Sequence, residues 1–287
     1  MNILVLGGTR FFGVHLVRAL VQEGHAVTIA TRGRTKDPFG EAVQRLTVDR
    51  TDAAAMRRVF AGRQYDAVCD DIAYCSRDVK NALDAIACKR YVLVSSASIY
   101  NPWHPGMTEG EFEPENANIV WGERDDFPYG EGKRQAEAVL AQSSQGENCA
   151  MVRFPLVVGP DDYTRRLRFY VEHAVKGTPM AADGLDAQLT FIDSQEAGRF
   201  LAFLLQSPLQ GPVNAASAGT VTLREVFDHV EKRVGKTPVL DETGEPAPYN
   251  GAEDFTLDTA KAQGAGFQFS EMRQWIFPLI DRYLAEM

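Results

Sequence analysis

The segment that most constrains the fold lies at the very start of the chain. Ile3 to Leu6 form a short, continuous apolar run, which is typical of a strand buried on both faces of a parallel sheet. The run is followed by Gly7-Gly8-Thr9-Arg10-Phe11-Phe12-Gly13, and apolar residues then recur at helical spacing as far as Leu20. A glycine-rich turn between a buried strand and a helix directs backbone N–H groups and the helix N-terminus at one point, where they stabilise an anion. The segment therefore predicts a strand–loop–helix unit that binds the pyrophosphate of a dinucleotide.

The apolar segments that follow alternate between strand-like and helix-like patterns. They predict strands at residues 26–30, 45–48, 67–69, 91–94 and 150–154, and helices that begin near residues 12, 79 and 129. This alternation with short connections is typical of an α/β fold with a mostly parallel sheet. We therefore expect a Rossmann-type, doubly wound parallel sheet with a small C-terminal lobe that binds substrate.

The pattern also suggests where these two parts begin and end. Residues 101–127 contain three prolines and no strong periodicity, which predicts a long loop beside a site. We expect residues 1–158 to form the dinucleotide-binding domain, with 189–215 returning to it. Residues 159–188 and 216–287 would then form the substrate-binding lobe.

The composition argues against several function classes. The 287 residues include 30 Lys and Arg against 39 Asp and Glu, a formal net charge of -9. Such a surface repels phosphate backbones, so we expect no nucleic-acid partner.

No apolar run approaches the ~18 residues of a membrane span, and the N-terminal run lacks the basic residues of a signal peptide. We therefore expect a cytoplasmic protein without a membrane partner. The four cysteines show no metal-ligand spacing, which predicts buried free thiols and no metal site.

The residues after the second predicted strand indicate which dinucleotide binds. An acid at this place would hydrogen-bond the ribose of NAD, whereas a basic group accommodates the 2′-phosphate of NADP. The sequence has Arg32 and Arg34 here and no acid before Asp37, which favours NADP over NAD. The alternative is that both arginines are solvated loop cations. Asp49, at the end of the third predicted strand, is expected to contact the adenine.

A second group of residues points to proton transfer. Tyr129 and Lys133 are spaced i, i+4 on a predicted helix and so share one of its faces. The lysine ammonium stabilises a phenolate, and the phenol can exchange a proton with a substrate oxygen. The serines of Ser95-Ser96-Ala97-Ser98 follow a predicted strand, so their hydroxyls emerge at the carboxyl edge of the sheet, where open α/β folds bind ligands.

In this order, these motifs resemble those of the extended short-chain dehydrogenase/reductases, the NAD-dependent epimerase/dehydratase family. The resemblance extends over most of the chain. Besides the glycine loop and the Tyr129/Lys133 pair, it rests on Asp66-Ala67-Val68 leading to Asp70-Asp71-Ile72-Ala73, Ser96 before Tyr100, Arg153-Phe154-Pro155 leading to Gly159-Pro160, and Phe191-Ile192-Asp193 with Glu196.

The resemblance implies a reaction and roles for individual residues. It implies hydride transfer between NADP or NAD and a secondary alcohol or ketone, as a reductase or an epimerase. Ser96 would orient the substrate, Tyr129 would be the general acid/base, and Lys133 would hold the nicotinamide ribose. A homodimer through a four-helix bundle is also implied, with the helices around 79–86 and 129–143 as candidate faces. The implied cofactor-binding residues are Gly7, Thr9, Arg10, Phe11, Phe12, Gly13, Ala73, Lys133 and Pro155.

The sequence departs from the family pattern at Arg10, which stands where the middle glycine of the loop is usual. A guanidinium there can bind a phosphate through two parallel hydrogen bonds, which would suit NADP. The GGTRFFG variant also resembles a subgroup that includes the chloroplast stem-loop RNA-binding proteins. The alternative function is therefore a nucleotide- or RNA-binding protein without redox activity. The complete set of Ser96, Tyr129 and Lys133 favours the enzyme.

Two further groups lie in the second half of the chain. Arg165, Arg166 and Arg168 follow Gly159-Pro160 and could clamp the phosphates of a nucleotide sugar or another phosphate-bearing substrate. The alternatives are a solvated helix face and a smaller carbonyl substrate. Asp193 and Glu196 are expected to tie the two lobes together rather than to perform chemistry.

Overall fold

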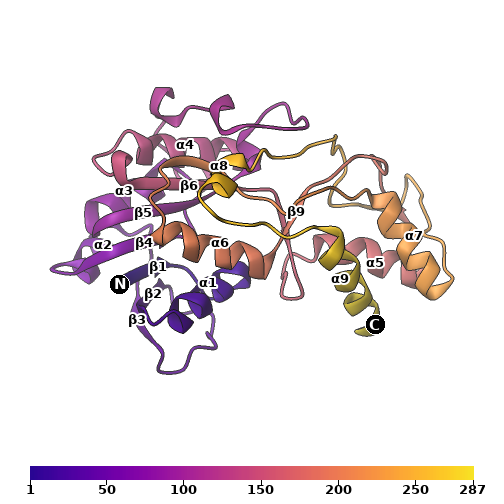
Figure 1. Ribbon diagram of the computed structural model, residues 1–287, viewed down its shortest axis with the longest axis horizontal. Coiled ribbons are helices and arrows are strands. Elements are labelled where there is room, and N and C mark those ends of the chain that lie inside the picture. Colours follow the sequence, from indigo (N-terminus) through magenta and orange to yellow (C-terminus); the bar gives the residue numbers. More distant parts are fainter.

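The structure, a computed structural model that describes all 287 residues, is built on a seven-stranded sheet (Figure 1). Every neighbouring pair of its strands is parallel. The order β10-β6-β5-β4-β1-β2-β3 reverses direction between β1 and β4, which is where doubly wound sheets bind ligands. The predicted Rossmann-type fold is thus confirmed. The strands are β1 Asn2–Leu6, β2 Ala26–Thr31, β3 Val43–Thr47, β4 Gln64–Asp70, β5 Ala87–Ser96, β6 Cys149–Phe154 and β10 Gly211–Asn214.

Helices cover both faces of this sheet because alternate residues of its buried strands face opposite sides. In β1, Ile3 and Val5 belong to a core that includes side chains of α1 and α6. Leu4 and Leu6 belong to a second core on the other face, under α2, α3 and α4. The helices are α1 Phe11–Gln22, α6 Ser194–Gln206, α2 Ala53–Phe60, α3 Ser76–Ala85 and α4 Tyr129–Ala141.

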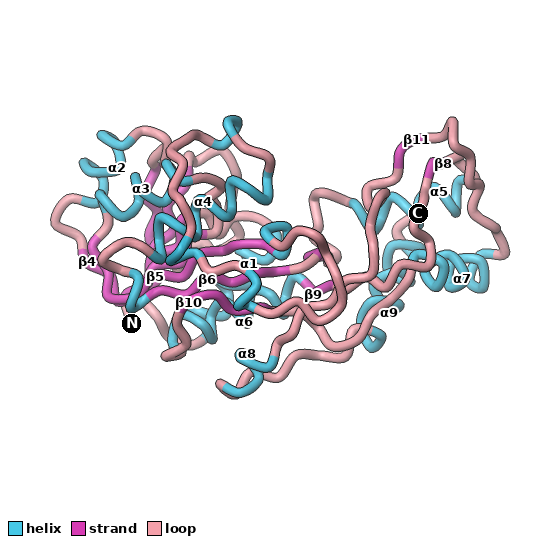
Figure 2. The backbone as a smooth tube through the Cα atoms, turned by 90° about the horizontal axis from the view of Figure 1, so that it is seen from above, coloured by secondary structure: helices cyan, strands magenta, loops and turns pink.

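The C-terminal part forms a second body with its own core, seen on the right of Figure 2. This lobe contains α5 Arg166–Lys176, α7 Leu223–Val234 and α9 Arg273–Ala285, with the short strands β8 Met180–Ala181 and β11 Glu245–Pro246. Another two-stranded sheet pairs β7 Leu156–Val158 with β9 Phe191–Asp193. The helix α8 Ala260–Gly264 lies within 216–287 but contacts β10, and its Ala262 belongs to the core of the sheet.

The segment 101–127 contains no strand and no α-helix, as predicted. It forms three short 3-10 turns, Glu109–Glu111, Pro114–Asn116 and Arg124–Asp126, and a further turn at Ala97–Ile99 precedes it. A fully buried guanidinium holds the segment in place. Arg153 of β6 pairs with Glu137 of α4 at 2.7 Å and donates to the backbone oxygens of Glu109 and Phe112. An irregular loop is therefore fixed against the sheet by a buried ion pair.

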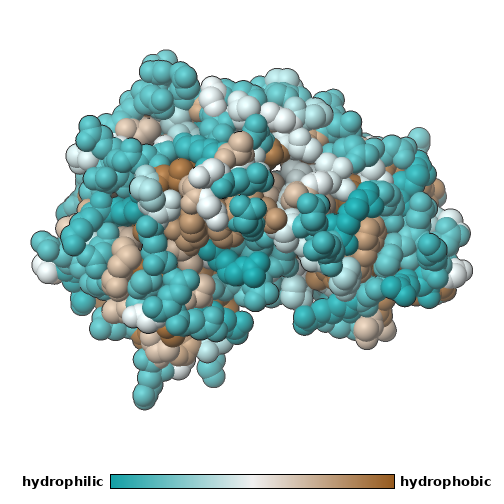
Figure 3. Space-filling model, viewed as in Figure 1, coloured by the Kyte–Doolittle hydropathy of each residue, from teal (hydrophilic) through white to brown (hydrophobic).

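Two further observations concern the helices and the surface of the molecule. No helix is both long and apolar enough to cross a membrane. On the face shown in Figure 3 the surface is mostly hydrophilic, with hydrophobic side chains visible in several small groups.

Candidate active site

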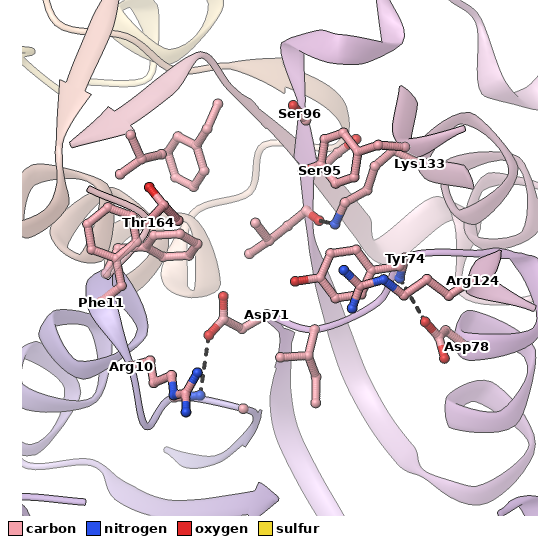
Figure 4. A pocket seen from close by; sticks show the side chains of 18 of the residues that line it. Arg10, Phe11, Asp71, Tyr74, Asp78, Ser95, Ser96, Arg124, Lys133 and Thr164 are labelled. Carbon is pink, nitrogen blue, oxygen red and sulfur yellow. Dashed lines mark hydrogen bonds between the residues drawn. The ribbon is translucent and has the colours of Figure 1, made fainter. Parts of the chain in front are cut away.

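A cavity of about 810 Å³ lies at the carboxyl ends of the strands, bordered by the sheet and the lobe (Figure 4). Its size is within the range of ligand pockets. The structure brings most of the predicted site residues into this one cavity. Those that line it are Gly7, Thr9, Arg10, Phe11, Phe12, Arg32, Arg34, Asp49, Ser96, Tyr129, Lys133, Pro155 and Arg166.

The glycine loop is packed so closely that side chains would not fit. Gly7 and Gly8 have φ angles of 105° and 79°, which L residues rarely adopt. A Cβ on Gly8 would lie 2.9 Å from a methyl group of Val17, and a Cβ on Gly13 would lie 3.0 Å from the Cα of Gly8. Gly13 does not line the cavity and serves the packing of α1 against the loop. The loop thus forms a cradle of bare backbone, which fits the pyrophosphate of a dinucleotide.

Arg10 lies at the rim of this cradle and is exposed. Its guanidinium lies 5.3 Å from the centre of the Tyr163 ring, and it forms no ion pair with a carboxylate. Tyr163 also contacts Phe11 edge-on, with ring centres 6.2 Å apart. Side chains from the glycine loop and from the segment before α5 therefore meet across the cavity.

The predicted NADP-selective residues line the part of the cavity next to β2. Neither Arg32 nor Arg34 is paired with a carboxylate, so their donors are available to a ligand. Asp49 accepts hydrogen bonds from the backbone N–H and the hydroxyl of Thr51, at 3.0 and 2.8 Å. These bonds lower the pKa of Asp49, and the two arginines contribute to the lowering.

Ser96 ends β5, Tyr129 begins α4 and Lys133 follows one turn later, and all three line the cavity. The Lys133 side chain is 2% exposed, and its Nζ donates to the backbone oxygens of Ala73 and Val94 at 2.6 and 2.8 Å. The same Nζ lies 5.8 Å from the centre of the Tyr129 ring. Ser96 Oγ accepts a hydrogen bond from the backbone N–H of Ser98 at 3.1 Å. The lysine is thus fixed, whereas the tyrosine is half exposed.

The two glycines between Tyr129 and Lys133 explain how the start of α4 comes so close to the loops that follow β5 and β4. A Cβ on Gly130 would collide with the backbone oxygen of Ser98, and one on Gly132 with that of Tyr74. The first turn of α4 can therefore lie directly on the loops that follow β5 and β4. This close approach places Tyr129 and Lys133 in the cavity that Ser96 also lines.

Three predictions need correction. Gly13, which packs α1 against the loop, does not line the cavity. Ala73 does not line the cavity: its side chain is fully buried in the core beneath α3 and α4, and only its carbonyl serves the site, by accepting from Lys133. Arg165 and Arg168 do not line it either. Both pair with Glu172, and Arg168 also pairs with Glu286 at 2.5 Å. Arg165 precedes α5 with a φ angle of 56°, and Arg168, two residues along the helix from Arg166, faces another direction; of the three, only Arg166 lines the cavity.

Several lining residues were not predicted. Asp71 and Tyr74 follow β4, and Arg124 lies with its guanidinium 4.0 Å from the centre of the Tyr74 ring. The rings of Trp103 and Phe255 lie with their centres 4.4 Å apart and their planes tilted by 39°, and they form an apolar wall shared by the long loop and the lobe. Asp71 and Tyr74 had a signal in the sequence, because they directly follow a strand beside the switch point. The Trp103–Phe255 contact joins distant segments and has no local signal.

Burial changes the pKa of two of these residues. It raises the pKa of Tyr74 to about 12, so its hydroxyl stays protonated at neutral pH. Burial also raises the pKa of Asp71 to about 6, against the lowering effect of a hydrogen bond from the backbone N–H of Gly8. No group of three His, Cys, Asp or Glu side chains is placed to hold a metal ion.

Two reductases are among the proteins to which the chain is similar. The 2-alkyl-3-oxoalkanoate reductase of Stenotrophomonas maltophilia is 30% identical over 239 residues, covering 76% of this chain and 68% of the relative. The 2'-dehydrokanamycin reductase of Streptomyces kanamyceticus is 29% identical over 247 residues, covering 82% and 67%. The chloroplast stem-loop binding protein of 41 kDa b from Arabidopsis thaliana is 26% identical over 205 residues, covering 66% of this chain. The chain spans 50% of that relative's length.

Solved structures show the same fold over the whole chain. The UDP-glucose 4-epimerase of Thermotoga maritima with UDP-glucose has a TM-score of 0.78 at 18% identity, covering 100% of this chain and 99% of the other. The Thermus thermophilus UDP-glucose 4-epimerase complex with NAD has a TM-score of 0.72 at 23% identity, covering 100% of both. Residues 3–78 match the family described as NAD dependent epimerase/dehydratase. Together with the extended similarity to the Stenotrophomonas reductase, this match shows that the chain belongs to the NAD-dependent epimerase/dehydratase family.

Proposed function

We propose that the protein is an NADP(H)-dependent reductase that acts on a small ketone or the corresponding secondary alcohol. The observation that carries this proposal is that Ser96, Tyr129 and Lys133 line the same cavity as the glycine loop. Binding alone places no demand on a serine, a tyrosine and a lysine in the lining of that cavity. Proton transfer to a substrate oxygen does require such groups.

The residues that would hold the cofactor lie on both sides of the switch point. The cradle of Gly7 and Gly8 would take the pyrophosphate, Asp49 would face the adenine, and Pro155 would lie by the nicotinamide. Arg32 and Arg34 support the preference for NADP, because two unpaired guanidinium groups at this place suit a 2′-phosphate. When bound, the cofactor supplies the hydride.

The chain's own residues manage the proton and the orientation of the substrate. The Ser96 hydroxyl would hydrogen-bond the substrate oxygen and hold it beside Tyr129. The Tyr129 hydroxyl would donate its proton to that oxygen as the carbonyl is reduced. The buried Lys133 ammonium, fixed by two backbone oxygens, would stabilise the phenolate that forms. In the direction of oxidation the phenolate would take the proton back.

The wall of the cavity favours a partly apolar substrate. Trp103 and Phe255 present aromatic surface, and Arg166 is the arginine of its group that remains to bind an anionic substituent. The names of two relatives, both reductases, support net reduction of a small carbonyl compound over epimerisation of a nucleotide sugar. The proposed partners are therefore small molecules.

Replacing Tyr129 with phenylalanine tests this proposal. Tyr129→Phe removes only the hydroxyl, so we expect turnover to fall by at least about a hundredfold while NADPH binds with nearly unchanged affinity. The measurements are reduction of a panel of small ketones followed by NADPH absorbance, and NADPH titration by fluorescence. Tyr249→Phe is the control, because the buried Tyr249 hydroxyl lies outside the cavity and has no hydrogen-bond partner. Equal activity of wild type and Tyr129→Phe would refute the mechanism.

Binding of a nucleic-acid stem-loop is the second candidate function, and the name of the Arabidopsis relative is what favours it. The net charge of -9 opposes it, because a phosphate backbone is repelled by an acidic surface. A mobility-shift titration with a stem-loop RNA, run beside the NADPH titration, distinguishes the two functions. Tight RNA binding without dinucleotide binding would make this the leading function.

A further inference from the structure

Asp71 places a carboxylate against the glycine loop. It follows β4 directly, and its Oδ2 accepts a hydrogen bond from the backbone N–H of Gly8 at 3.3 Å, as Figure 4 shows beside Arg10. The same oxygen lies 3.1 Å from the position that a Cβ of Gly7 would take, and 2.5 Å from that of Gly13. An anionic side chain thus occupies the cradle that the loop offers to a phosphate.

We propose that the Asp71 carboxylate competes with the dinucleotide pyrophosphate for the N–H groups of the glycine loop and thereby sets the affinity for the cofactor. This inference rests on the proposed dinucleotide binding. The Gly8 N–H cannot serve both anions at full strength, and two anions in one partly desolvated cradle repel each other. A bound pyrophosphate therefore requires that Asp71 be neutral or turn away.

The surroundings of Asp71 determine when it is neutral. On its own strand and loop, the charged Asp70 favours the neutral form, and burial favours it more strongly. From α4, the Lys133 ammonium favours the charged form, as does the Gly8 N–H from the glycine loop. Burial prevails, and the pKa of Asp71 is raised to about 6. The other titratable or charged groups close by are Cys69 on β4, Tyr74 on the same loop and Arg10 at the start of α1.

The sign of the pH dependence follows from this value. Below a pH of about 6 the carboxyl is protonated, carries no charge and can donate a hydrogen bond to a phosphate oxygen. Above this pH it is ionised and competes with the pyrophosphate. Dinucleotide affinity should therefore fall as the pH rises through about 6.

The test is a titration of wild type, Asp71→Asn and Asp71→Ala with NADH and NADPH, followed by fluorescence at several pH values. NADH is the decisive probe, because it lacks the 2′-phosphate that itself titrates in this range. We expect wild-type affinity for NADH to weaken by at least about tenfold from about pH 5 to about pH 8, and both variants to bind with little pH dependence. At about pH 8 both variants should bind at least about tenfold more tightly than wild type. Asp125→Asn is the control, because it removes the same charge outside the cradle.

The outcomes separate this inference from the proposed function. If Asp71→Asn and Asp71→Ala bind NADH more weakly than wild type at high pH, Asp71 is a binding group and the competition is refuted. Equal, pH-independent binding by all variants would also overturn it, while leaving the proposed function intact. If neither wild type nor the variants bind either dinucleotide at low pH, the proposed function fails together with the inference.

Discussion

At the scale of single residues, Arg32 decides between two cofactors. It lines the cavity next to β2 and forms no ion pair that a substitution would disrupt. We expect Arg32→Ala to weaken NADPH binding about tenfold and NADH binding less than about twofold, because a charge-assisted contact to the 2′-phosphate contributes about 1.5–3 kcal/mol. Fluorescence titration with both dinucleotides measures this. Arg58→Ala, an exposed arginine outside the cavity, is the control. Equal losses for the two dinucleotides would contradict a 2′-phosphate contact.

Which individual residues could be predicted depended on how local their signals are. Ser96, Tyr129 and Lys133 were predicted because their spacing and their place after a strand locate them at one edge of the sheet. Arg168 was placed wrongly because residues two apart on a helix face different directions, and Arg165 because it precedes α5; both pair with Glu172 of α5. A carboxylate partner seven residues away, such as Glu172 for Arg165, is visible in the sequence only once the helix is known.

At the scale of elements, the start of α4 depends on Gly130 and Gly132. Helix propensity alone predicts that alanine at either position stabilises the helix by about 1 kcal/mol. The close contact with the Ser98 and Tyr74 carbonyls predicts the opposite, because the added Cβ would push α4 away from both loops. We therefore expect Gly132→Ala to lower kcat/KM at least about tenfold and to destabilise the protein by about 1–3 kcal/mol.

A matched substitution controls for helix propensity in that experiment. Gly264 also lies in a helix, α8, and a Cβ there would meet nothing within 4 Å. Gly264→Ala should therefore leave kcat/KM unchanged and should not destabilise the protein. The measurements are steady-state kinetics and urea unfolding of both variants. Equal behaviour of Gly132→Ala and Gly264→Ala would show that the close approach of α4 does not position the site.

The elements themselves were predicted where periodicity is strong. The apolar runs of β1, β2 and β6 locate these strands within about two residues, because strands buried on both faces carry few polar side chains. β7 and β9 were not predicted, since three residues are too few to show a period. The long loop was predicted as irregular, but not its anchor, because Arg153 reaches it from β6 through contacts between distant segments.

At the scale of the whole molecule, the cavity exists because the sheet domain and the C-terminal lobe are held in a fixed position relative to each other. Glu196 on α6 is buried and accepts hydrogen bonds from Ser217 Oγ at 2.7 Å, and from the backbone N–H and Oγ of Ser270 at 2.7 and 2.9 Å. Ser270 lies just before α9, and Ser217, which lies between β10 and α7, accepts a hydrogen bond from Trp275 Nε1 of α9. Of the two carboxylates expected to tie the two parts together, Glu196 makes such contacts, whereas Asp193 accepts from the backbone N–H groups of Gln195 and Glu196 and so caps α6. The role of the Glu196 carboxylate is structural, and its removal should destabilise the lobe more than the sheet.

Glu196→Ala measures how strongly the stability of the lobe depends on the hydrogen bonds to this carboxylate. The substitution removes the acceptor of the buried Ser217 hydroxyl and of two partly buried donors of Ser270, and a buried donor costs about 1–3 kcal/mol when unsatisfied. Since water can enter and relieve part of the cost, we expect the free energy of unfolding to fall by about 2–4 kcal/mol in urea denaturation. Hydrogen exchange should show the loss of protection first in α7 and α9, because Ser270 lies just before α9, and Ser217, which lies between β10 and α7, accepts a hydrogen bond from Trp275 of α9. Glu253→Ala, an exposed lobe carboxylate without an ion pair, should change stability by less than about 0.5 kcal/mol. If Glu196→Ala were equally mild, the packing of apolar surface, not this carboxylate, would hold the two bodies together and so maintain the cavity.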